Sequence, residues 1–399
     1  MRSTKPLNLI STRWRESRAH TSYTTGVSLH SHTSFSQETL DFVSSACDWV
    51  PGFRPIFRYY ERRARERHGV TLNLRRACWR PPLQPRMAYN VESCQIQQLH
   101  LIPLVSLTDH DCMEAPLLLR TLPSSRHIPM STEWSAPFGR TVFHLGIHNL
   151  PSLHCAEWMR RFLAYTREAE ALRALSADTA ASDRALLALL EELHAISQVL
   201  TVCNHPVWDL HKVGAPLHLA ELRRFLSLAG PTVHALELNG LRHAAENRHV
   251  TRLAQQTGHL LLSGGDRHGL EPNATINLSA ASTFTEFVQE LRIERRSHIL
   301  FLDQYRTPWQ QRILQSTLDA ITDFPEFVPG WQHWDERAFH PGPDGRMRSL
   351  RELWGDGQAP LPLRAALRAA RLGRNPLMAA PLRLAFPGVN RLSIEAETL

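Results

Sequence analysis

Short apolar segments alternate with amphipathic segments along most of the chain. The short apolar runs are typical of buried strands, and apolar residues spaced three and four positions apart are typical of helices. The strand candidates are residues 27–30, 101–111, 127–134, 140–148, 199–206, 234–240 and 259–268. The helix candidates are residues 155–175, 183–197, 217–230 and 242–258. Strands that alternate with helices predict an α/β fold with a mostly parallel sheet.

The order of these elements is consistent with an irregular barrel. The strand candidates 127–134 and 140–148 are separated by APFG, which predicts a hairpin turn and an antiparallel pair. In barrels of alternating strands and helices, active residues gather at the C-terminal ends of the strands. Polar residues at the ends of the strand candidates are therefore the candidates for chemistry.

Three segments flank or interrupt the predicted barrel, which we assign to residues 26–300. Residues 1–25 are expected to form a basic, poorly ordered tail. Residues 41–98 are an insertion rich in arginine and aromatic residues; it either folds over one end of the barrel or forms a solvated helix and a proline-rich loop. Residues 301–399 form an extension, expected to be helical, that either packs on the barrel or binds a partner.

The composition of the chain indicates which class of protein to expect. Of the 399 residues, 43% are hydrophobic and 21% are charged, so the chain is expected to be globular. It has no apolar run long enough for a membrane span, and its N-terminus lacks the apolar core of a secretory signal. The six cysteines include no CxxC pair, so we expect neither a disulfide framework nor a zinc ribbon. The predicted location is the cytoplasm.

The net charge of +7 is unevenly distributed. Residues 1–90 contain 15 Lys and Arg against 6 Asp and Glu, while the rest of the chain is slightly acidic. Lys5 and Lys212 are the only lysines, so the positive charge is nearly all arginine. Arginine suits bidentate contacts with phosphate, and a nucleic-acid partner of the arginine-rich segment 54–86 is one interpretation. A genome that favours arginine codons is the other.

Imidazoles and carboxyls occur at most of the predicted strand ends. His30 and His32 are two residues apart, so in a strand they face the same side, where two imidazoles can share a metal ion. Asp266 and His268 repeat this spacing. The other strand ends carry Asp109, His110, Asp111, Glu133, His144, His205 and Glu237. Each alone is a common surface or core residue, but burying all of them without a metal would be costly. A shared metal cluster is the simplest account.

Several motifs of the chain resemble those of the PHP family, the polymerase and histidinol phosphatase domain. They are LHSHTSFS at 29–36, SLTDHD at 106–111, TEW at 132–134 with FHLGIH at 143–148, CNHPVW at 203–208 and LSGGDRH at 262–268. The resemblance covers about residues 26–290, except the insertion. It implies a distorted (β/α)7 TIM-like barrel of PHP type. It also implies a two- or three-metal site at the C-terminal face of the barrel and hydrolysis of phosphate esters.

The resemblance further implies a role for each matching residue. His30, His32 and Asp266 would bind a first metal ion, and Glu133 would bridge it to a second ion bound by His144 and His205; His110 and His268 would bind a third. Asp109 and Asp111 would support the ligands from behind or steady the charge of the site. Arg267 lies between two ligands, and at the tip of its strand it could turn toward a substrate phosphate; Arg140 is a second candidate for this contact. We group Asp109, Asp111 and Arg267 as catalytic.

The chain departs from the family pattern at one place. The family usually has Asp or His five or six residues after the second histidine, where this chain has Gln37 and Glu38. Glu38 could act as a carboxylate ligand, whereas Gln37 would be a poor one. His148 is a second imidazole near His144, and the hairpin register could exchange the two; the distance from Glu133 favours His144.

The expected function is a metal-dependent phosphoesterase that acts on a phosphomonoester or nucleotide. Histidine and carboxylate ligands suit zinc, manganese or iron better than magnesium alone. Two such ions joined by Glu133 would supply a metal-bridging hydroxide at neutral pH. Two alternatives remain: an amidohydrolase-like metal hydrolase, because hydroxide also attacks carbonyls, and a degenerate PHP module with a binding role.

Overall fold

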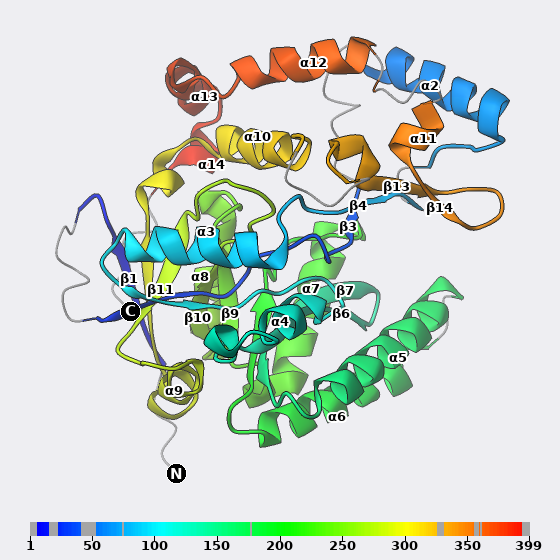
Figure 1. Cartoon of the computed structure of the whole chain (residues 1–399). Helices are drawn as coiled ribbons and strands as arrows, with labels where there is room; N and C mark the ends of the chain where they lie inside the picture. The colour runs from blue at the N-terminus through cyan, green and yellow to red at the C-terminus, as the bar shows by residue number, and fades with distance from the viewer. Residues whose placement is uncertain are drawn as a thin grey trace.

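The computed structural model describes residues 6–15, 23–40, 53–73, 76–175, 178–324, 331–354, 359 and 361–392. These residues form a central α/β body that is covered on one side by a helical layer and a small sheet (Figure 1). The predicted α/β class is confirmed, but both five-stranded sheets mix parallel and antiparallel pairs, so the expectation of a mostly parallel sheet is wrong. In the described part of the chain, no helix has the length and apolar character needed to cross a membrane.

The first of two five-stranded sheets includes a strand near the start of the chain. Its strands, in spatial order, are β1 (Leu7–Thr12), β12 (Arg296–Phe301), β11 (Thr275–Ser279), β2 (Thr25–Ser28) and β5 (Ile102–Val105). β1 pairs in parallel with β12, so the expectation of a poorly ordered tail is wrong for this segment. The remaining tail residues 1–5 and 16–22 lie outside the described residues. β11 is antiparallel to both of its neighbours.

The second sheet contains most of the predicted strands. Its order is β10 (Leu260–Gly264), β9 (Ala235–Asn239), β8 (Leu200–Asn204), β7 (Thr141–Leu150) and β6 (Met130–Phe138). β8, β9 and β10 are parallel and alternate with α7 (Ala215–Ala229) and α8 (Ala244–Thr257). The predicted hairpin is present as β6 and β7, but its turn consists of Gly139 and Arg140, because AlaProPhe of APFG belongs to β6. Gly139 has a φ of +52°, which glycine adopts readily.

The two sheets meet at two isolated bridges. Ser31 bridges Arg267, and His110 bridges Glu133. Among the described strands no continuous ladder joins the two sheets into a closed barrel, so the predicted distorted (β/α)7 barrel is not confirmed by the hydrogen bonding. Both bridges lie next to candidate metal ligands, which places the chemistry where the two sheets touch.

A large apolar core fixes the second sheet against its helices. Trp134 of β6 stacks on Phe162 of α5 (Cys155–Ala174) with ring centroids 4.4 Å apart, and both side chains are buried. α6 (Ala180–Ala195) adds Leu190 and α7 adds Phe225 to the same core. Burying each such side chain stabilises the fold by roughly 1.5–3 kcal/mol. The strands that carry Glu133 and its neighbours are therefore held rigidly.

The insertion and the C-terminal extension fold together. They form a four-stranded sheet in the order β14 (Met347–Ser349), β13 (Ala338–Pro341), β4 (Cys78–Trp79) and β3 (Glu38–Thr39). The extension is therefore not purely helical. The predicted insertion also ends too late, since α3 (Pro85–Gln97) is the crossover helix that parallel neighbours such as β2 and β5 require. Residues 41–52 and 74–75 lie outside the described residues.

The remaining helices surround this framework. Those of the body are α4 (Glu114–Leu119) and α9 (Phe284–Gln289). The insertion contributes α2 (Phe53–His68), which exposes Arg58, Arg62 and Arg65, and its nucleic-acid interpretation stays a prediction. The extension contributes α10 (Trp309–Ala320), α11 (Leu350–Trp354), α12 (Leu361–Leu372), α13 (Ala379–Ala385) and α14 (Pro387–Asn390).

Candidate metal centre

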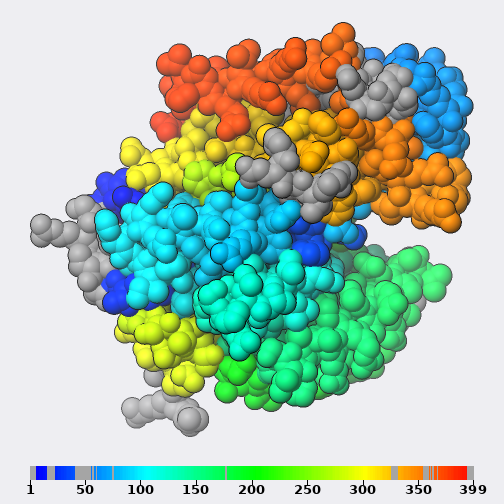
Figure 2. Space-filling view, viewed as in Figure 1, coloured from blue at the N-terminus to red at the C-terminus, as the bar shows by residue number. Residues whose placement is uncertain are grey.

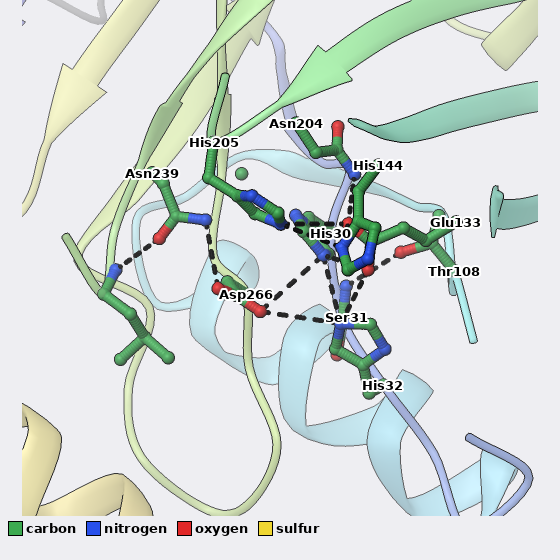
Figure 3. A network of polar contacts seen from close by, with 12 residues as sticks. His30, Ser31, His32, Thr108, Glu133, His144, Asn204, His205, Asn239 and Asp266 are labelled. Atoms are coloured by element: carbon green, nitrogen blue, oxygen red, sulfur yellow. Dashed lines mark hydrogen bonds and ion pairs between the residues drawn. The ribbon is translucent and has the colours of Figure 1, made fainter. Parts of the chain in front are cut away.

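Imidazoles and carboxylates from both five-stranded sheets gather at one place (Figure 3). His30 and His32 follow β2, His110 follows β5, His205 follows β8, and Asp266 and His268 follow β10, while Glu133 and His144 lie within the β6–β7 hairpin. Residues separated by more than 200 positions thus meet because the strands of both sheets end here. His110 and His268 are half-buried, and the others are buried.

Glu133 occupies the middle of this group. Its Oε2 atom lies 3.1 Å from Nε2 of His30, 3.4 Å from Nε2 of His32 and 3.3 Å from Nδ1 of His110. Its Oε1 atom lies 3.3 Å from Nδ1 of His144 and 3.2 Å from Nε2 of His205. Each carboxylate oxygen therefore faces its own set of imidazoles, an arrangement suited to a carboxylate that joins two cations.

The HxH pair forms a compact donor set with Asp266. The Nε2 atoms of His30 and His32 are 3.0 Å apart, and Oδ1 of Asp266 lies 3.7 Å from the first and 3.5 Å from the second. Two ligand atoms about 2.0–2.1 Å from a tetrahedral zinc ion would be separated by roughly 3.3 Å. The spacing and the mixture of nitrogen and oxygen donors fit a divalent ion of this kind.

Glu38 supplies a third donor set with two half-buried histidines. Its Oε2 atom lies 3.2 Å from Nε2 of His110 and 3.4 Å from Nε2 of His268, and its Oε1 atom lies 3.6 Å from Nδ1 of His32. Gln37 is exposed to solvent, so of the two residues left open by the sequence only Glu38 reaches the centre. β3 carries Glu38 and pairs with β4, so the small sheet of the insertion and extension delivers this carboxylate.

Glu237 and two asparagines position these ligands through hydrogen bonds. Oε1 of Glu237 lies 2.6 Å from Nδ1 of His30, and its Oε2 atom accepts a hydrogen bond from the backbone N–H of His205. The amide of Asn239 donates to Glu237 and to Asp266, and the amide of Asn204 donates to Glu133. The sequence analysis put Glu237 at a strand end without giving it a role, and it did not identify either asparagine. The two asparagines could have been found from their positions, because they are the last residues of β8 and β9.

The carboxylates and several imidazoles of the centre shift one another's pKa values. Burial alone would raise the pKa of Glu133, but the facing imidazoles of His30, His110 and His144 hold it well below its usual value. Burial opposes charge on His110, yet Glu38 and Glu133 outweigh it and raise the pKa of His110 to about 10. Glu38 and Asp266 similarly raise the pKa of His268 to about 9 against the effect of burial. The carboxylates of the centre therefore stabilise positive charge on the groups that they surround.

Two predicted residues after β5 form hydrogen bonds with the segments that carry ligands rather than with imidazoles. Asp109 accepts hydrogen bonds from the backbone N–H and the hydroxyl of Thr33, the residue after His32. Burial raises the pKa of Asp109 to about 7, although these hydrogen bonds oppose the shift. Asp111 accepts a hydrogen bond from the backbone N–H of Ser135 on β6. Both carboxyls therefore position the segments that carry ligands.

The predicted catalytic role of Arg267 is corrected by its contacts. Its guanidinium is buried and faces α3, where it lies 3.4 Å from Glu92 and donates to Gln95. Arg267 lies between Asp266 and His268 in the sequence, but these contacts turn its side chain away from the cluster, and the φ of +52° at Asp266 shows that the backbone is not that of a regular strand. Arg140 is exposed in the β6–β7 turn. His148 is buried against Ser106, and it is His144 that lies beside Glu133.

No family model matches the chain, and none of the curated proteins matches it. Among solved structures, it is similar to an amidohydrolase from Chromobacterium violaceum with bound sulfate and no metal, with 17% identity over 47% of this chain and 83% of that chain and a TM-score of 0.30. It is also similar to a protein described as a metal-dependent phosphoesterase from Bifidobacterium adolescentis, with 16% identity over 53% of this chain and 92% of that chain and a TM-score of 0.31. At these TM-scores the similarities carry no argument about function.

Proposed function

We propose that the chain is a metal-dependent hydrolase of phosphate esters, a PHP-type phosphoesterase that acts on a phosphomonoester or a nucleotide. The observation that carries this proposal is the position of Glu133 between two sets of imidazoles, with one carboxylate oxygen toward each set. Together with the resemblance of the motifs, this geometry favours two divalent ions side by side. The contacts of Glu38 with His110 and His268 favour a third.

The donor sets fit divalent ions by their chemistry. Mixed imidazole and carboxylate donors suit zinc, manganese or iron. Bound ions would supply positive charge for the phosphate oxygens and a water molecule acidic enough to act as a nucleophile at neutral pH. The ligands would be His30, His32 and Asp266 for one ion, Glu133, His144 and His205 for the next, and Glu38, His110 and His268 for the third.

The residues of the chain have separate tasks in this proposal. Glu237 fixes the ring of His30 and the backbone of His205, so both ligands keep their orientation when substrate binds. Asp109 fixes the segment after His32, and Asp111 fixes the part of β6 that follows Glu133. His110 and His268 are the more exposed ligands, so the substrate phosphate is expected to approach from their side.

An activity panel tests the proposal. The purified protein is stripped with a chelator and reloaded with manganese or zinc. It is then assayed on histidinol phosphate, mononucleotides, bisphosphorylated nucleotides and short oligonucleotides, with amides and lactones in parallel. Metal-dependent release of phosphate is the expected result. Cleavage of amides or lactones alone would favour the amidohydrolase alternative, and a protein that retains no ion would favour a binding module.

A further inference from the structure

The helical layer at the end of the chain exposes large apolar side chains. α12, the turn Pro376–Met378 and α13 form the outermost layer of the molecule, coloured orange and red in Figures 1 and 2. The exposed fractions are 68% for Leu361, 74% for Leu372, 82% for Leu377 and 82% for Leu384. These four leucines define what we call the leucine face.

The spacing of the two leucines in α12 aligns them on the solvent side of that helix. Leu361 and Leu372 are eleven residues apart in α12, which is close to three helical turns, so they project in the same direction. The opposite side of α12 carries the half-buried Leu367 and Ala370 and packs toward α10. The leucine face is therefore a second apolar surface, in addition to the one that attaches α12 to the protein.

Positive charge surrounds the leucine face. Residues 361–392 contain six arginines and no aspartate or glutamate. Arg368 and Arg371 are exposed on α12 beside Leu372. Arg374 forms an ion pair with Asp319 on α10, which offsets one of the six charges. The exposed leucines together with Arg368 and Arg371 form a surface that is both apolar and cationic.

We propose that the leucine face binds the surface of an anionic lipid bilayer. A surface-lying helical segment inserts apolar side chains at the boundary of the acyl chains, while arginines contact the anionic headgroups. Single-stranded nucleic acid is a poorer match, because such sites use several aromatic side chains for stacking and residues 361–392 contain one, the partly exposed Phe386. A second copy of this chain would bring like charges together across the contact. The partner is therefore a bilayer, and the binding is independent of the hydrolase activity proposed above.

Vesicle flotation with the full chain tests this proposal. The protein is mixed with vesicles of phosphatidylcholine alone or of phosphatidylcholine and phosphatidylglycerol in equal parts. We expect binding to the anionic vesicles and little binding to the neutral ones. The double variant L377S/L384S is expected to bind about tenfold more weakly, because two apolar anchors are lost. R368Q/R371Q is expected to weaken binding at low salt and to reduce its salt dependence.

A matched control separates the leucine face from exposed leucines in general. Leu153 and Leu175 are 92% and 78% exposed at the two ends of α5, so L153S/L175S removes a similar amount of apolar surface elsewhere. This variant should bind anionic vesicles as the parent does. Circular dichroism and metal content should match the parent in all variants. The proposal is overturned by absent binding to anionic vesicles, by equal loss in both leucine variants, or by preferential binding of an oligonucleotide that L377S/L384S leaves unchanged.

Discussion

Nε2 of His30 lies 3.0 Å from Nε2 of His32, and both imidazoles are buried. The backbone after β2 remains extended enough that the two rings point to one side, as the HxH spacing predicts. The Oδ1 atom of Asp266 and the Oε2 atom of Glu133 complete the surroundings of these nitrogens. Nitrogens this close repel unless a proton or a cation lies between them, and the adjacent carboxylates stabilise the positive charge of either one.

Replacing Asp266 by asparagine should remove a metal ligand without changing the shape of the side chain. We expect at least a hundredfold loss of metal-dependent activity and a lower metal content, because a neutral amide is a poor ligand. Elemental analysis and phosphate release measure the two effects. Asp303, an exposed carboxylate on the outside of the fold, is the matched control, and D303N should behave as the parent. Full activity in D266N would contradict the assignment of this donor set.

Substitutions of Glu38 and of its neighbour Gln37 should have different effects on metal binding. E38Q should lower the number of bound ions or weaken the binding of one, since Glu38 is the carboxylate shared by His110 and His268. Q37D should leave metal content unchanged, because its side chain is exposed. Titration with zinc against a chromophoric chelator distinguishes the variants. A gain of metal in Q37D would show that position 37, not position 38, completes the third donor set.

Glu237 should act on the metal only through the residues that it holds. E237Q loses the charged contact with His30, and we expect metal affinity to fall by about 10–100-fold. The thermal midpoint and a chelator competition are measured together. If affinity is unchanged while stability falls, Glu237 supports the fold and does not orient the ligands.

Metal binding should release protons in a pH-dependent way. The pKa values of about 10 for His110 and about 9 for His268 mean that both imidazoles are protonated at pH 8 before metal binds. A ligand nitrogen must be deprotonated, so binding at pH 8 should release about two protons from these residues. The number should fall as the pH rises through the two pKa values. Isothermal titration in buffers of different ionisation enthalpy measures it, and no release at pH 8 would contradict this account.

Arg267 should stabilise the fold rather than bind substrate. Removing one partner of a buried ion pair costs about 3–5 kcal/mol, so R267M should lower the free energy of unfolding by about this amount. The double variant E92L/R267M should be less destabilised than either single variant, because neither charge is left unpaired. Urea unfolding measures these differences. A stable R267M with a raised KM for substrate would restore the catalytic role.

The sequence predicted the parts of the fold that depend on local pattern. The helices after residues 155, 183, 217 and 242 and the strand ends with His30, His205 and Asp266 follow from periodicity alone. β11 and β12 were missed, since neither carries a residue that marks a site. Leu7–Thr12 was misassigned because a short strand at the end of a basic segment gains its stability from β12, which lies almost 300 residues away.

The candidate site was predictable where ligands lie on or directly after strands that the sequence predicts, and less so where a ligand depends on pairing between distant segments. Glu133 and His144 face each other because β6 and β7 are adjacent in the sequence. Glu38 depends on β4 and β13, and only the long-range pairing of the insertion with the extension could have favoured it over Gln37. Arg267 shows the converse, since it lies between two ligands in the sequence and yet its buried contacts with α3 keep it out of the site.

Anomalous X-ray scattering from crystals grown with zinc or manganese tests the central claim most directly. The account predicts one peak within bonding distance of His30, His32 and Asp266 and a second peak on the other side of Glu133, beside His144 and His205. Data collected at the absorption edge with no peak at either position, under conditions where the protein is folded and the ions are in excess, would contradict it.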